Sequence, residues 1–125
     1  MATAKEVFEA LIEKAGFEVD NESKNWTKNT FAWKNIAPGK VYIYFQTGTG
    51  KEYDTPNFGF CREDGLTERE VKDIKVELHN IVGGDPEDDR AFVYVNVKNL
   101  GDRSVEWALR TMEELERRIL FRLSQ

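Results

Sequence analysis

Two stretches of this chain alternate aliphatic and aromatic side chains with a period of two. Val41–Gln46 reads VYIYFQ, and residues 91–98 read AFVYVNVK. Successive side chains of a β-strand point to opposite faces of its sheet, so each stretch predicts a strand with one aliphatic and one aromatic face. The aliphatic face comprises Val41, Ile43, Phe45, Val93, Val95 and Val97, and the aromatic face comprises Tyr42, Tyr44, Phe92 and Tyr94. Such an aliphatic face suits burial beneath helices.

Two further stretches have the composition of strands. Residues 30–36 are rich in aromatic and β-branched side chains, and Pro38 with Gly39 forms a turn pair before Val41–Gln46. Together these residues predict a β-hairpin. Asn57–Arg62 follows a glycine-rich loop and predicts a shorter strand.

Helices are indicated by their end signals and apolar stripes. Two of them begin with the spacing of a capping box, in which a Thr and a Glu three residues later bond each other's backbone; the pairs are Thr3–Glu6 and Thr67–Glu70. Gly16 and Gly83 follow the two stripes and predict left-handed helix ends. Asp102 or Ser104 begins a third helix of about 20 residues. Its expected i,i+4 ion pairs are Glu106–Arg110, Glu113–Arg117 and Glu114–Arg118.

These elements predict the α+β class in a single domain over residues 1–125. The expected fold is a mostly antiparallel sheet of about four strands with three helices, in the order α-β-β-β-α-β-α. Two arrangements of the aromatic face stay open at this stage. It is either a recognition surface in contact with solvent or a buried layer beneath the last helix.

Composition narrows the class of protein. The formal net charge is −5, and no apolar run approaches the roughly 18 residues of a membrane helix, so we expect a cytoplasmic protein that does not contact membranes. The N-terminus lacks the apolar core of a signal peptide. Cys61 is the only cysteine, which excludes an intrachain disulfide and a multi-thiolate metal site. We expect no cofactor.

Catalytic motifs are missing from the sequence. Residues 46–52 read QTGTGKE, but the glycine spacing differs from a phosphate-binding loop and Glu52 stands where Ser or Thr is needed. His79 is the only histidine and lies on the second predicted helix, where a surface position is expected. The acidic residues 85–89 lack the ligand alternation of a calcium loop and predict a solvated turn. The sequence therefore predicts a protein that is not an enzyme and has no metal site.

One segment combines cationic and aromatic side chains. Five lysines and no carboxylate lie between Lys24 and Lys51, although the whole chain is acidic. Aromatic anchors dominate many protein interfaces, so this segment and the last predicted strand suggest an inhibitor, immunity or adaptor protein that binds a larger protein partner. The expected contact residues are Lys28, Trp33, Lys34, Lys40, Tyr42, Tyr44 and Tyr94.

The alternative is a nucleic-acid-binding or nuclease-associated accessory domain. Its lysines would contact phosphates, and Trp26, Trp33 or Tyr44 would stack on bases. An isoelectric point near 5.0 argues against it, because nucleic-acid-binding domains are usually basic. Edge strands of a small sheet also allow pairing between two copies, so a homodimer is a further expectation to test.

Overall fold

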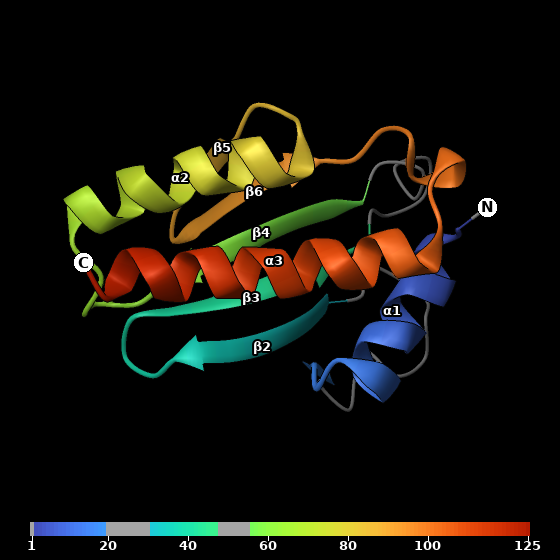
Figure 1. Ribbon diagram of the computed structural model, residues 1–125, viewed down its shortest axis with the longest axis horizontal. Coiled ribbons are helices and arrows are strands. Elements are labelled where there is room, and N and C mark those ends of the chain that lie inside the picture. Colours follow the sequence, from blue (N-terminus) through green and yellow to red (C-terminus); the bar gives the residue numbers. More distant parts are fainter. Residues whose placement is uncertain (1, 20–30, 48–55) are drawn as a thin grey trace.

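The computed structural model describes residues 2–19, 31–47 and 56–125. These residues form three helices and one six-stranded sheet (Figure 1). The helices are α1 (Ala4–Lys14), α2 (Glu68–Val82) and α3 (Val105–Leu123), with a 3-10 turn, η3 (Leu100–Asp102), before the last. The strands are β1 (Glu18–Val19), β2 (Phe31–Ala37), β3 (Val41–Gln46), β4 (Asn57–Arg62), β5 (Glu87–Asp89) and β6 (Phe92–Asn96). The predicted α+β class is confirmed.

The sheet has two more strands than the sequence indicated. All neighbouring strands pair antiparallel, in the order β1-β2-β3-β4-β6-β5. The additional strands, β1 and β5, lie at the two edges and are two and three residues long. The expected solvated turn at residues 85–89 is thus partly an edge strand. Short, charged edge strands resist pairing with other chains, and the same composition hides them from a search for apolar alternation.

The helix ends follow the sequence signals. Both predicted capping boxes form, at Thr3–Glu6 and at Thr67–Glu70. Gly16 and Gly83 adopt the left-handed conformation, with φ of 76° and 96°. Ser104, rather than Asp102, caps α3 by accepting a hydrogen bond from the backbone N–H of Trp107 at 3.0 Å.

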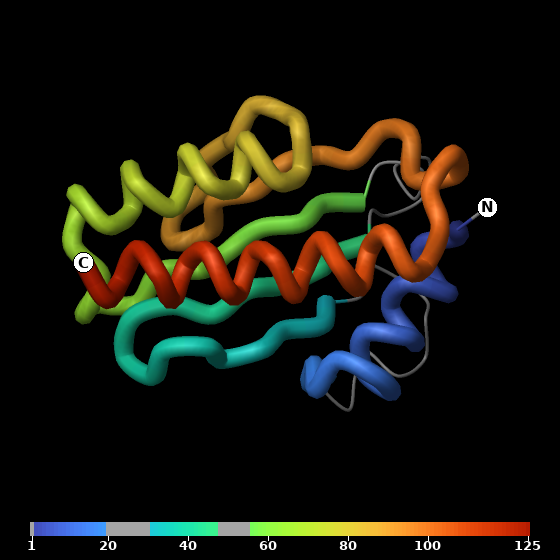
Figure 2. The backbone as a smooth tube through the Cα atoms, viewed as in Figure 1, coloured from blue at the N-terminus to red at the C-terminus, as the bar shows by residue number. Residues whose placement is uncertain are grey.

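The three helices pack on the aliphatic face of the sheet. Val41, Ile43 and Phe45 of β3 join side chains from all three helices in one buried cluster. Figure 2 shows α3 crossing this face lengthwise, antiparallel to α2. The alternative in which the last helix covers the aromatic face is therefore wrong, because α3 buries the aliphatic face instead.

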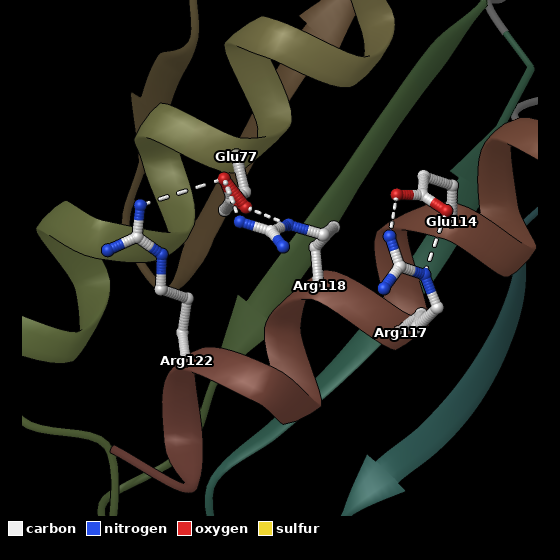
Figure 3. A network of polar contacts seen from close by, with 5 residues as sticks. All are labelled: Glu77, Glu114, Arg117, Arg118 and Arg122. Atoms are coloured by element: carbon white, nitrogen blue, oxygen red, sulfur yellow. Dashed lines mark hydrogen bonds and ion pairs between the residues drawn. The ribbon is translucent and has the colours of Figure 1, made fainter.

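A buried carboxylate joins α2 to α3. Glu77 of α2 is 4% exposed, and one of its oxygens accepts a hydrogen bond from Nε of Arg118 at 2.7 Å. Arg122 Nη2 lies 3.7 Å from the other oxygen (Figure 3). Arg117 pairs with Glu114 one turn earlier in α3. The expected Glu113–Arg117 and Glu114–Arg118 pairs are therefore wrong, since Arg118 turns toward α2 and Arg117 takes Glu114.

Candidate functional site

The aromatic face of the sheet lies opposite the helices and is the candidate functional site. Strand register places Trp33, Tyr44, Gly59 and Tyr94 side by side across β2, β3, β4 and β6. None of their side chains belongs to the buried cluster beneath the helices. The sheet thus separates an aliphatic core from a second, aromatic layer that no described helix covers.

Four rings form the centre of this face. The ring centroids of Phe31 and Tyr44 lie 5.0 Å apart in a stacked arrangement, and those of Tyr44 and Phe92 lie 5.4 Å apart edge to face. Trp33 stacks on Phe31 at 5.9 Å. Tyr44 is 1% exposed, whereas Phe31, Trp33 and Phe92 are half-buried. Tyr44 is therefore the floor of the face, and the half-buried rings are the parts that a partner can touch.

Gly59 lets β4 and β6 lie close together at the centre of the sheet. It lies between Tyr44 and Tyr94 in the register. A Cβ added there would lie 2.2 Å from the carbonyl oxygen of Val93 and 2.9 Å from Cα of Tyr94. Such distances are far below van der Waals contact, so only glycine fits this position without a shift of β6.

The hydroxyl and thiol groups of this face are held in their neutral forms. Burial raises the pKa of Tyr44 well above its ordinary value, and burial with the hydrogen bond to Cys61 does the same for Tyr42. Burial also raises the pKa of the Cys61 thiol, whose residue is 5% exposed. A buried thiol with a raised pKa is a poor nucleophile, so Cys61 serves as a packing residue.

Carboxylates flank the aromatic face at both edges of the sheet. Glu18 of β1 pairs with Trp33 in the register, and Glu87 of β5 pairs with Tyr94. Asp89 lies opposite Phe92, also on β5, and all three acidic residues are exposed. Because successive side chains of a strand alternate between faces, Asp88 points to the other side, where it accepts a hydrogen bond from Lys75 of α2 at 2.8 Å. The described edges of the face are therefore acidic.

The lysines expected at the site lie elsewhere or outside the described residues. Lys34 points to the helix side of β2 and pairs with Glu116 of α3 at 2.8 Å. Lys40, at the hairpin turn, pairs with Glu70 of α2 at 3.0 Å. Lys28 lies outside the described residues. Tyr42, Tyr44 and Tyr94 share one face, as the alternation predicted, and Trp33 lies beside Tyr44 on it. Lys34 does not join them, because successive residues of a strand point to opposite sides. Lys40 does not join them because it lies in the turn between β2 and β3, where it pairs with α2.

The residues considered above for catalysis or metal binding do not form a site in the part of the chain that the structure describes. His79 is exposed at the end of α2, where its Nδ1 lies 2.8 Å from the carbonyl oxygen of Gly84. Within residues 2–19, 31–47 and 56–125, no three His, Cys, Asp or Glu side chains gather as metal ligands would. Residues 48–52 of the QTGTGKE stretch lie outside the described residues.

Sequence reasoning missed four residues of this face: Phe31, Asn57, Gly59 and Asp89. Phe31 lies two residues before Trp33 in the same strand, so the alternation within residues 30–36 could have placed it on the same face as Trp33. Gly59 and Asp89 carried none, because their importance depends on which strands become neighbours of β4 and β6.

None of the helices in the described ranges is long and apolar enough to cross a bilayer. Comparisons with models of protein families, with curated proteins and with solved structures find no match to this chain.

Proposed function

We propose that this protein is a small non-enzymatic binding protein, of the inhibitor, immunity or adaptor kind, that recognises a larger protein partner through the aromatic face. One observation carries the proposal: the helices gather on the aliphatic face, while Trp33, Tyr42 and Tyr94 remain half-buried on the other. Large rings with polar tips supply contact area at low conformational cost and are enriched at protein interfaces.

Charge favours a protein over a nucleic acid. Bases stack readily on half-buried rings, but a nucleic acid also brings phosphates to the surface around them. Glu18, Glu87 and Asp89 would repel those phosphates, and Lys34 and Lys40 are paired with carboxylates of the helices. A nucleic-acid-binding or nuclease-associated role is therefore the second candidate, supported only by the stacking surface.

The test compares two ring variants with a matched control. We expect immobilised protein to capture a discrete partner from its native cell extract, and the partner is then purified and its affinity measured by calorimetry. Trp33→Ala and Tyr42→Ala should each weaken binding by about 2 kcal/mol or more if these rings are anchors. Phe121→Ala removes a ring that is 48% exposed on α3, on the helix side, and should leave the affinity unchanged.

Two results would contradict the proposal. One is a partner whose affinity is the same for folded Trp33→Ala, Tyr42→Ala and Phe121→Ala proteins. The other is tight binding to single-stranded oligonucleotides near physiological salt with a steep log-linear salt dependence, which indicates phosphate contacts. Tyr44→Ala is unsuitable as a binding variant, because the Tyr44 side chain is buried and its removal perturbs folding.

A further inference from the structure

A small pocket opens at one end of the aromatic face. Its volume is about 220 Å³, and four rings contribute to its wall. The lining residues are Phe31, Tyr44, Gln46, Asn57, Asp89, Phe92 and Tyr94. They come from four different strands, β2, β3, β4 and β6, and from the edge strand β5. We call this cavity the aromatic pocket.

The rings of the aromatic pocket meet at steep angles. Phe92 is nearly perpendicular to both Phe31 and Tyr44, with interplanar angles of 89° and 83°. Phe31 and Tyr44 lie at 30° to one another. A side chain that enters among rings in these orientations meets ring faces as well as edges. The face of an aromatic ring is its electron-rich part and attracts cations.

Two oxygen groups of the pocket lack a cationic or donor partner in the described residues. Asp89 is exposed and takes part in no ion pair. Oδ1 of Asn57 is buried and accepts no hydrogen bond. Glu87, in contrast, already accepts a hydrogen bond from Nδ2 of Asn96 at 2.8 Å. Asp89 is therefore the oxygen group that an entering side chain can reach, because Oδ1 of Asn57 has almost no contact with solvent.

The charged groups at the aromatic pocket, Glu87 and Asp89, are negative. Burial first, and then the negative charges of Glu87 and Asp89, raise the pKa of Tyr94 above its ordinary value. The aromatic ring faces and the free carboxylate of Asp89 both favour a positively charged hydrogen-bond donor. Asp89 would repel an anion, and a neutral apolar group would leave the carboxylate of Asp89 without a partner.

We propose that the aromatic pocket receives the cationic end of an arginine or lysine side chain from the protein partner. The inference rests on the proposed function and adds the chemistry of the partner. A guanidinium has five N–H donors and a flat face, so it can bond the carboxylate of Asp89 while it stacks on a ring. An ammonium has three donors and uses the same carboxylate and ring faces. The two are distinguished by the test.

The test titrates the labelled protein with short peptides and follows backbone amide NMR shifts. Glycine pentapeptides carry arginine, lysine, citrulline or norleucine at their centre, at concentrations up to tens of millimolar. We expect saturable shifts at Asn57, Asp89 and Tyr94 with the arginine or lysine peptide, and no saturable shifts with the neutral citrulline and norleucine peptides. The stronger of the two cationic peptides identifies the preferred side chain.

Two matched variants distinguish binding in the aromatic pocket from general electrostatic attraction to an acidic protein. Asp89→Asn should weaken the binding of the cationic peptide about tenfold, because it removes the free carboxylate. Asp88→Asn makes the same charge change on the same strand, but the Asp88 side chain faces α2 and should not alter binding. Equal effects of the two variants, equal binding of citrulline and arginine, or no shifts with either cationic peptide would each overturn the inference.

The inference and the proposed function fail on different results. Trp33 and Tyr42 belong to the aromatic face but do not line the aromatic pocket. Partner binding that depends on Trp33 and Tyr42 but is unchanged in Asp89→Asn overturns the pocket inference and leaves the proposed function in place. Partner binding indifferent to Trp33 and Tyr42 overturns the proposed function itself.

Discussion

Replacing Glu77 with alanine should lower the free energy of unfolding by about 2 to 3 kcal/mol, because two arginines would lose their buried counter-charge. Breaking a fully buried ion pair costs roughly 3 to 5 kcal/mol. Here the carboxylate is buried, with 6% of its side chain exposed, but Arg118 and Arg122 keep 30% and 32% of theirs in water. Partial rehydration of the arginines places the expected cost below the fully buried range.

The assay is thermal and urea unfolding of the Glu77→Ala protein. At roughly 2.1 cal/mol/K of unfolding entropy per residue, the loss corresponds to a decrease in melting temperature of roughly 8 to 11 °C for a chain of this length. Glu114→Ala is the control, because the Glu114–Arg117 pair lies on the outer surface of α3 (Figure 3). Equal melting temperatures for the two variants would refute the argument that burial gives the Glu77 network its strength.

Two further predictions concern the centre of the sheet and the start of α2. Gly59→Ala should destabilise the fold by about 2 kcal/mol through overpacking against β6, whereas Gly101→Ala should not, because no atom lies within 4 Å of its added Cβ; equal urea midpoints for the two would contradict this. The backbone N–H of Thr67, and then Lys40, lower the pKa of Glu70, so its stabilising contribution is present above its unfolded pKa and is lost as the pH falls through the lower folded value. Unfolding midpoints measured from pH 6 to pH 3 should therefore fall less steeply in Glu70→Gln than in the native protein, and parallel curves would count against the cap.

The acidic edges change the kind of partner that the surface favours. The sequence places lysines between the rings of the hairpin, which suggests a cationic surface for an anionic partner. In the folded chain Lys34 and Lys40 neutralise Glu116 and Glu70 of the helices, and the described charges beside the rings are Glu18, Glu87 and Asp89. The proposed partner is therefore one that presents cationic groups to this face.

Local sequence determined the elements and the parity of their side chains. Capping boxes, left-handed glycines and the alternation of Val41–Gln46 depend on residues within a few positions of one another, and each forms as predicted. Alternation also assigned Tyr42, Tyr44 and Tyr94 to one face, because the parity of a strand is fixed as soon as the strand exists.

Tertiary structure decided what each face meets. The sequence does not state that β6 pairs with β4, that β5 adds Asp89 beside Phe92, or that Arg118 reaches Glu77 on another helix. These contacts join residues that are far apart in the chain, and they depend on how strands and helices bury the aliphatic face together. The burial of that face under all three helices leaves the aromatic face as the candidate surface for a partner, because apolar area without polar tips is the costlier of the two to leave in water.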